Sequence, residues 1–221
     1  VSITVVKPGV QSTIQSRPRA GLRHQGVPSG GAADPLSLAL ANMLVGNAWD
    51  APAIEAALLG PTLGVERDCT IAVTGAIAAV TLNGATVHQH RTVFARAGDE
   101  LVIGACEAGA RVYVAVAGGF AVPEVLGSAA TNLQAAFGGL EGRALAAGDE
   151  LATVGGDVGA TKIRHHGTVQ RLRDAGRLAD LQRRRDRHAR SHVVVEGLAM
   201  GSDEVDFGDG HSALRHGMQH C

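Results

Sequence analysis

Apolar residues in the first 155 positions of this 221-residue chain occur mostly in short runs, which are separated by glycine, proline or asparagine. Runs of this kind, rich in valine, isoleucine and threonine, predict short β-strands joined by tight turns. The expected strands cover residues 3–6, 12–15, 70–74, 79–82, 85–87, 92–94, 101–103 and 111–116. Many short strands with tight turns favour an antiparallel barrel or sandwich, so the fold class we predict is mainly β.

Two turn signals refine this picture. Asn83-Gly84 lies between two of the runs, and this dipeptide readily adopts the positive φ angles of a type I′ hairpin. The pentapeptide Ala-Gly-Asp-Glu-Leu occurs at residues 97–101 and again at 147–151. We interpret the repetition as the same turn leading into a strand twice, because the similarity does not extend beyond five residues. The run at 70–74 is expected to end at Gly75.

One short helix is predicted after residue 34. Asp34 can cap free N–H groups at a helix start, and Pro35 suits the first turn. Apolar residues follow at helical spacing, and Gly46 can end the helix. These apolar residues are Leu36, Leu40, Met43 and Leu44. Residues 16–35 are expected to form a long loop, and a long loop that runs into a helix N-terminus is a candidate anion site.

Composition limits the core and the partners. Hydrophobic residues make up 45% of the chain but aromatic residues only 3%, so the core must be built from Ala, Val, Leu and Ile. The net charge of −1 gives no general attraction to nucleic acid or to an anionic membrane. No apolar run approaches the ~20 residues that span a bilayer. The N-terminus also lacks the pattern of a signal peptide, so we expect a cytoplasmic protein.

Charge is distributed unevenly along the chain. Residues 171–190 contain eight arginines and three aspartates, without aromatic residues or a nucleic-acid motif around them. We interpret this stretch as a solvated charged helix or an unstructured tail. The change of character after Gly159 indicates a β-rich domain over residues 1–155, followed by an atypical Arg/His-rich segment over residues 156–221.

Candidate chemistry gathers in the glycine-rich stretch 26–34. Glycines allow a backbone to approach a ligand, and its N–H groups can hold phosphate or carboxylate. No Gly-Lys-Ser/Thr follows, so it is not a Walker A loop, and an ordinary connecting loop is the alternative. His24 is a candidate general base. Asp34 and Glu55 are candidate acids or bases, although residues of this kind are more often caps or turn residues.

Two further groups of residues have more than one interpretation. Gly118-Gly119, after a strand, could cradle a ligand or simply form a tight turn. His88 and His90 are two apart on a presumed strand and would share one face, but without a third ligand we expect no metal site. The three cysteines, Cys69, Cys106 and Cys221, are far apart and show no zinc spacing.

An ordered series of motifs carries a family resemblance. The series comprises Thr13-Ile14-Gln15, Gly26 to Pro28, Gly30 to Asp34, Ala41 to Asn47, Ala53 to Glu55, Gly60 to Leu63, Val73 to Ala76, Tyr113 to Gly119, Val122 to Ser128 and Gly138 to Arg143. In this order they resemble the carboxyltransferase-domain family, over roughly residues 1–155. The family includes the C subunit of the prokaryotic ATP-dependent 5-oxoprolinase, formerly allophanate hydrolase subunit 2, and one half of the urea carboxylase carboxyltransferase domain.

The resemblance implies a cyclophilin-like β-barrel lobe and ATP-driven opening of 5-oxoproline to glutamate. It implies ATP, with Mg²⁺ accompanying it, and two partners: a second carboxyltransferase-family subunit and a third 5-oxoprolinase subunit. Neither nucleic acid nor a membrane is expected as a partner. The candidate catalytic residues are Asp34 and His24. The candidate substrate- or nucleotide-binding residues are Gln15, Ser29, Gly30, Glu55, Gly118 and Gly119, and no metal ligand is proposed.

Two departures from the family leave other functions open. Ser16 follows Gln15 where the family usually has Asp, and residues 161–221 show no counterpart of the family's second β-rich lobe. That lobe is therefore expected to be truncated or replaced, through a shifted reading frame or divergence, which would leave the chain inactive. The alternatives are a carboxyltransferase component of a urea carboxylase-like biotin enzyme, with biotin as cofactor, and a non-catalytic regulator that only binds its partner.

Overall fold

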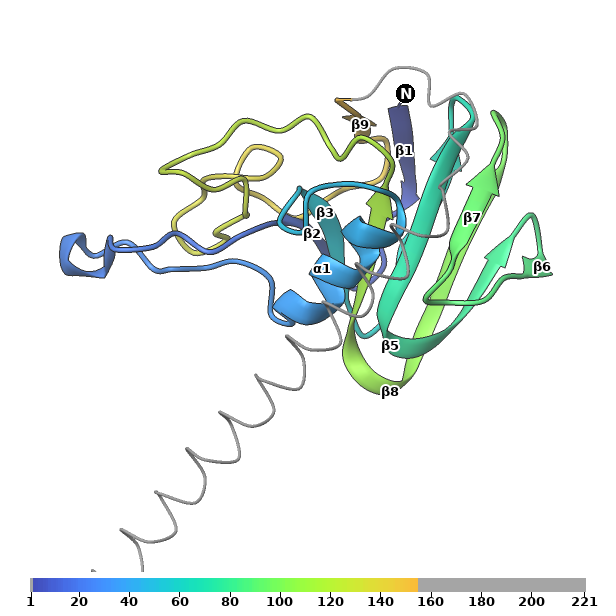
Figure 1. Ribbon diagram of the computed structural model, residues 1–221, viewed down its shortest axis with the longest axis horizontal. Helices are drawn as coiled ribbons and strands as arrows, with labels where there is room; N and C mark the ends of the chain where they lie inside the picture. The colour runs from blue at the N-terminus through green and yellow to red at the C-terminus, as the bar shows by residue number, and fades with distance from the viewer. Residues whose placement is uncertain (1, 155–221) are drawn as a thin grey trace, which may run out of the picture. The chain divides into compact units, whose positions relative to one another are not determined.

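The computed structural model describes residues 2–154, which form one antiparallel β-structure with a single α-helix (Figure 1). The strands are β1 Ser2–Lys7, β2 Gln11–Gln15, β3 Ala53–Ala57, β4 Thr62–Val65, β5 Cys69–Leu82, β6 Ala85–Thr86, β7 Thr92–Ala95, β8 Glu100–Val116 and β9 Glu150–Ala152. The helix α1 covers Pro35–Leu44, and a 3₁₀ turn, η1, covers Arg23–Gln25. The expected mainly β fold with one short helix is confirmed. The Arg/His-rich segment lies outside the described residues.

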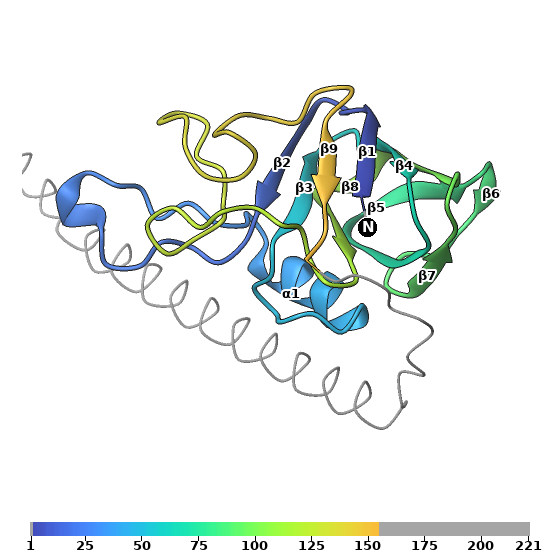
Figure 2. The ribbon, with the colours of Figure 1, turned by 90° about the horizontal axis from the view of Figure 1, so that it is seen from above.

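The nine strands form one sheet that curls into a half-barrel (Figure 2). Its main path runs in the order β2-β3-β8-β4-β1-β9, and β5 pairs with β8, β7 and β6. All of these pairs are antiparallel. Strand β8 joins the two parts, because it pairs with β5 on one side and with both β3 and β4 on the other.

Strands β5 and β8 are much longer than the sequence pattern predicts. The expected end at Gly75 is wrong, because β5 continues to Leu82. Gly75 has φ +97° and lies where the register with β8 first shifts, so it forms a bulge. A Cβ atom at this position would collide with the backbone carbonyl oxygen of Arg111. The expected strands 101–103 and 111–116 are likewise two parts of β8.

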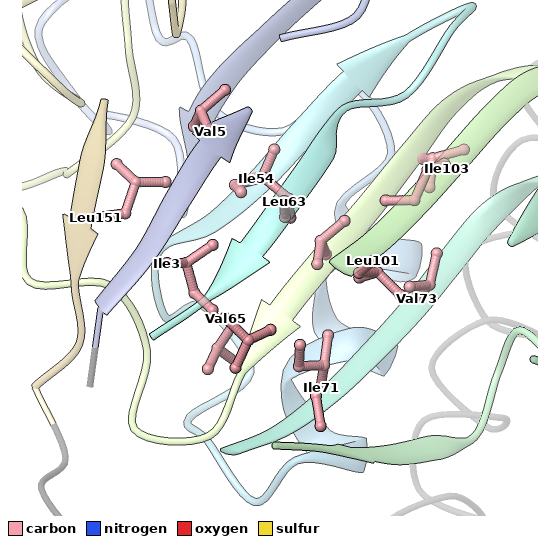
Figure 3. Packing of buried hydrophobic residues seen from close by; sticks show 14 of the residues in the cluster. Ile3, Val5, Ile54, Leu63, Val65, Ile71, Val73, Leu101, Ile103 and Leu151 are labelled. Atoms are coloured by element: carbon pink, nitrogen blue, oxygen red, sulfur yellow. The ribbon is translucent and has the colours of Figure 1, made fainter. Parts of the chain in front are cut away.

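The core divides into two clusters according to the alternation of side chains along β8. Val112, Val114 and Val116 point into the main cluster. Figure 3 labels other members of this cluster, which come from strands that include β1, β4, β5 and β9. Tyr113 and Ala115 point to the opposite face, where they pack against α1. This period of two is what an extended strand buried on both faces requires. Apart from Phe120 and Tyr113, the fully buried core is aliphatic, as the composition predicts.

Helix α1 begins as predicted. The Asp34 carboxylate accepts hydrogen bonds of 3.1 Å from the backbone N–H groups of Leu36 and Ser37, and Pro35 occupies the first turn. Leu38, Ala41 and Leu44 face the sheet, and Leu40 packs against them in part. Of the apolar residues named at helical spacing, Leu36 is exposed because it belongs to the start of the helix.

Both turn predictions hold. Asn83 and Gly84 have φ angles of +51° and +79° and connect β5 to β6. The two copies of the pentapeptide form equivalent turns: Gly98 donates to the Val65 carbonyl at 2.7 Å, and Gly148 donates to the Val5 carbonyl at 2.8 Å. The first turn contacts β4 and leads into β8, which pairs with β4. The second turn contacts β1 and leads into β9, which pairs with β1.

Candidate functional site

A cleft of about 260 Å³ lies between the start of the sheet and the loops beside it. Its lining comes from β2, β3, the loop 16–34 and the loop after β8; the residues are Gln11, Thr13, Gln15, Pro28, Gly30, Glu55, Thr131, Asn132, Leu133 and Gln134. Alternate residues of β2 face the cleft because a strand repeats every two residues. Glu55 joins them because it is the register partner of Thr13 on β3.

Gln15 is the most buried of the predicted site residues in this cleft, with 7% of its surface exposed. Its amide nitrogen donates to the Thr13 hydroxyl at 3.0 Å and to the Thr131 carbonyl at 3.3 Å. Its amide oxygen, Oε1, is buried without a hydrogen-bond partner in the described residues. A buried carbonyl oxygen without a donor is costly, so this atom is a weak point in the packing of the cleft wall.

Glu55 is held by three groups at the edge of the cleft. Its Oε2 accepts hydrogen bonds of 2.8 Å from the Tyr113 hydroxyl and from the backbone N–H of Ala33, and its Oε1 lies 3.3 Å from Nε of Arg111. The Tyr113 hydroxyl in turn accepts a 2.7 Å bond from the backbone N–H of Asp34. Burial, and then the Glu55 charge, raise the pKa of Tyr113, so its hydroxyl remains a donor.

Arg19 supports the far wall of the cleft although it does not line it. Its side chain is 99% buried, and it donates to the carbonyls of Val125, Ser128 and Ala130 at 2.9, 3.2 and 2.6 Å. Its guanidinium also lies 4.6 Å from the centre of the Phe137 ring. Burial lowers the pKa of Arg19. These bonds fix the chain just before Thr131 and thereby position the four lining residues 131–134.

The other predicted site residues lie away from this cleft. Asp34 caps α1, with bonds to two backbone N–H groups and to the Ser37 hydroxyl. His24 lies in η1, at the tip of an arm that extends away from the sheet (Figures 1 and 2), with its Nε2 3.2 Å from the Gln25 amide. The Ser29 hydroxyl accepts a bond from Arg23. Cleft residues Pro28 and Gly30 flank Ser29.

The predicted anion site at the start of α1 is not free. The Asp34 carboxylate already accepts hydrogen bonds from the first free N–H groups of the helix. Just before the helix, the N–H of Ala33 donates to Glu55 and the N–H of Asp34 donates to Tyr113. Gly118 and Gly119 form a turn after β8, in which the Gly118 N–H donates to the Asn47 amide oxygen and the Gly119 N–H to the Val116 carbonyl. The structure thus brings together Gln15, Gly30 and Glu55 of the predicted residues.

Sequence reasoning missed the part of the cleft that the loop after β8 supplies. Residues 131–134 have no glycine motif and no hydrophobic period, so no local signal marks them. Their position depends on long-range bonds: both the N–H and the hydroxyl of Thr131 donate to the Ile14 carbonyl at 2.9 Å. These bonds fix the loop against β2, and the Arg19 side chain holds the residues just before it.

His88 and His90 do not lie on a strand, because both fall in the connection between β6 and β7. The expectation that they share a strand face was therefore wrong. Within residues 2–154, no three His, Cys, Asp or Glu side chains lie close enough to hold a metal ion. In the same range, no helix is both long and apolar enough to cross a bilayer.

Comparison with known proteins identifies the family. The model of the carboxyltransferase domain, subdomain A and B, matches residues 25–205. The chain belongs to the carboxyltransferase domain family. This membership agrees with the ordered motifs over residues 1–155, and the matched range also extends past residue 155.

Curated relatives in the carboxyltransferase domain family fall into two groups. The 5-oxoprolinase C subunit of Haemophilus influenzae is 42% identical over 143 residues, which are 65% of this chain and 46% of that protein. The Escherichia coli C subunit is 40% identical over 149 residues, 67% of this chain and 48% of that protein. Urea amidolyase of Lachancea kluyveri is 43% identical over 148 residues, or 66% of this chain and 8% of that protein. The chain therefore spans less than half the length of each of these relatives.

Solved structures agree with this assignment. The Kluyveromyces lactis urea amidolyase structure superposes with a TM-score of 0.67 at 38% identity and covers 69% of this chain and 9% of that chain. The structure of TTHA0988 superposes with a TM-score of 0.66 at 33% identity, covering 71% of this chain and 31% of that chain. The half-barrel is thus an architecture of the carboxyltransferase domain family.

Proposed function

We propose that this chain acts as the C subunit of an ATP-dependent 5-oxoprolinase, which opens the lactam of 5-oxoproline to glutamate. The observation that carries the proposal is the cleft, which gathers Gln15, Gly30 and Glu55 in a domain related to 5-oxoprolinase C subunits at 40–42% identity. The lactam would lie in this cleft. A second carboxyltransferase-family subunit and a third 5-oxoprolinase subunit would complete the enzyme.

The chemistry requires activation of a poor electrophile. An amide carbonyl resists attack by water, and transfer of the ATP γ-phosphoryl group to its oxygen would make the carbonyl carbon a better electrophile. Water would then add to that carbon, the ring nitrogen would take up a proton and leave as the amine, and hydrolysis of the resulting acyl phosphate would release phosphate and glutamate. Hydrolysis of the lactam C–N bond is then coupled to hydrolysis of ATP to ADP and phosphate, with Mg²⁺ accompanying the nucleotide. Within this scheme the chain's residues hold the amide in place. Glu55 is fixed by Tyr113 and Ala33 and does not need to reorganise when the substrate binds.

The test is reconstitution with the partner subunits. We expect ATP hydrolysis that depends on 5-oxoproline when this chain and both partners are mixed, and no such stimulation when this chain is left out. If the partners gain nothing from the chain, it is either a non-catalytic binding protein or inactive. Co-purification with the second carboxyltransferase-family subunit separates these two outcomes.

A second candidate function is supported by the relatedness to urea amidolyase at 43% identity. In that case the domain would transfer a carboxyl group from carboxybiotin to urea or a similar amide. A reconstitution that consumes urea in the presence of a biotin carrier and carboxylase, and leaves 5-oxoproline unchanged, would favour this candidate.

A further inference from the structure

Leu58, which directly follows β3, combines a strained backbone with an exposed side chain. It is the central residue of a three-residue turn in which the Leu59 N–H donates to the Ala57 carbonyl at 2.7 Å, and its φ angle is +62°. Turns of this kind with a positive central φ are rare and strained for any residue but glycine. The Leu58 side chain is 55% exposed, so its packing does not offset the strain. A strained position whose side chain does not serve the fold is a candidate for contact with another molecule.

Leu58 belongs to an apolar patch that is built from segments far apart in the sequence. The Leu58 N–H donates to a carbonyl of β8 at 3.1 Å, and the Val10 N–H donates to the Leu59 carbonyl at 3.2 Å. On β5, Ile77 is 57% exposed and pairs with Ala108 of β8, at the bend where the register of the two strands shifts (Figure 1). Six exposed residues make up what we call the Leu58 patch: Val10, Leu58, Leu59, Ile77, Ala108 and Ala110.

The Leu58 patch has a single charge close to it. Residues 57–61, 76–79 and 104–110 contain only one charged side chain, the exposed carboxylate of Glu107. Within residues 2–154, Glu107 makes no ion pair. An apolar area without interspersed charges is typical of a surface that binds another protein, and the free carboxylate favours a lysine or arginine opposite it. A second copy of the patch would present another carboxylate instead, so the charge favours a different chain as the partner.

The Leu58 patch lies beside the cleft without being part of it. None of its residues lines the cleft, but Val10 directly precedes Gln11, which does. A protein seated on the patch therefore reaches the rim of the cleft. A subunit that completes the enzyme has to contact this chain at such a place.

We propose that the Leu58 patch is the docking surface for the second carboxyltransferase-family subunit. That subunit covers Leu58 and Ile77 with apolar side chains and places a lysine or arginine opposite Glu107. The inference rests on the proposed function and adds the surface through which the two subunits meet.

A substitution that relieves the strain separates binding from folding. Leu58→Gly removes the positive-φ strain and the exposed side chain together, so the urea midpoint of the full chain should change little. Its dissociation constant for the second subunit, measured by isothermal titration calorimetry, should rise at least about tenfold. Leu126→Gly is the matched control, because Leu126 has φ +53° and is 53% exposed but lies outside the patch. This control should bind within about twofold of the unchanged chain.

Two further variants test the rest of the patch. Ile77→Thr keeps a β-branched residue in β5 and should weaken binding by about threefold or more, which keeps the inference testable even if Leu58→Gly fails to fold. Glu107→Gln should weaken binding by about threefold at low salt, and this difference should shrink at about 0.5 M salt. An effect of Glu107→Gln that is independent of salt would contradict a cation opposite the carboxylate.

The outcomes that overturn the inference are specific. They are no binding between the unchanged chain and the second subunit, or unchanged affinity in both Leu58→Gly and Ile77→Thr. A dimer of the chain alone in sedimentation, which Leu58→Gly converts to a monomer, would show that a second copy covers the patch. Stimulated ATP hydrolysis that survives both variants refutes only the inference. Loss of subunit binding in both variants, together with no ATP hydrolysis by the unchanged complex, refutes only the proposed function.

Discussion

The Tyr113 hydroxyl donates a 2.8 Å hydrogen bond to Oε2 of Glu55 and so joins the face of the sheet beneath α1 to the cleft. The same hydroxyl accepts from the backbone N–H of Asp34 at the helix start. A single phenol oxygen therefore fixes both the helix cap and a residue of the cleft wall.

Removal of that oxygen should cost both stability and cleft geometry. Tyr113→Phe leaves the Asp34 N–H without its acceptor and Glu55 with one donor fewer, so we expect a loss of about 2 kcal/mol in the free energy of unfolding. Urea denaturation of both proteins at pH 7 measures the difference. A loss below ~0.5 kcal/mol would mean that water replaces the hydroxyl and that the link is not structural.

The buried thiol of Cys69 should make the free energy of unfolding fall at alkaline pH. Burial raises the pKa of its thiol from 9.0 to about 11, so the unfolded chain releases the proton first. The stabilisation is therefore present below pH 9 and is lost as the pH rises towards 11, by roughly 1 kcal/mol between pH 8 and pH 10. Cys69→Val should flatten this part of the pH profile of urea unfolding. Cys106→Ser should keep the original slope, and a flattened slope there would refute the assignment.

Arg17 and Arg19 offer a matched comparison two residues apart. Arg19 is buried on three backbone carbonyls, so Arg19→Met should cost about 3 kcal/mol in unfolding free energy. Arg17 pairs with Asp50 and Glu124 at the exposed surface, and Arg17→Met should cost less than ~1 kcal/mol. Equal losses would show that burial of Arg19 does not decide its contribution.

Asp149 and Asp99 occupy the same place in the two equivalent turns but have different partners. Asp149 accepts from both terminal nitrogens of Arg143, at 2.7 and 2.9 Å, whereas Asp99 accepts from the Asn83 side-chain amide at 2.7 Å. Hydrogen bonds from Arg143 lower the pKa of Asp149, so its stabilisation is present above pH ~4 and is lost as the pH falls below it.

We therefore expect Asp149→Ala to cost about 1 kcal/mol at pH 7 and Asp99→Ala to cost less. The difference between the unchanged protein and Asp149→Ala should shrink below pH 4 in urea titrations. A difference that is independent of pH would show that the Arg143 pair contributes nothing, and that the loss comes from the turn alone.

Local signals predicted much of the fold. The Asp34-Pro35 helix start and the Asn83-Gly84 hairpin were both confirmed, because a cap and a type I′ turn depend on residues adjacent in sequence. The ordered motifs also identified the family correctly. What failed was the assumption that glycine ends a strand: Gly75 lies inside β5, where pairing with β8 continues across the bulge.

The candidate site was predictable only in part, because a cleft depends on distant segments. Gln15, Gly30 and Glu55 belong to the loop-to-helix region and the neighbouring strand, and they meet in the cleft. Thr131 carries no such local signal, since its position depends on bonds to Ile14, 117 residues away in sequence. Asp34 and His24 carry reactive groups, yet Asp34 caps a helix and His24 lies on an exposed turn.

The first strand of the sheet has consequences for how the protein is made. Ile3 in β1 pairs with Leu151 in β9, and the Leu145 N–H donates to the carbonyl of Ser12 in β2. A ribosome therefore releases β1 well before its first partner β4 and long before β9, and one edge of β1 stays unpaired until almost the whole described domain is synthesised. Slow translation or early termination would leave this edge of the nascent chain with unpaired backbone N–H and C=O groups, which is the kind of edge through which strands of different chains associate.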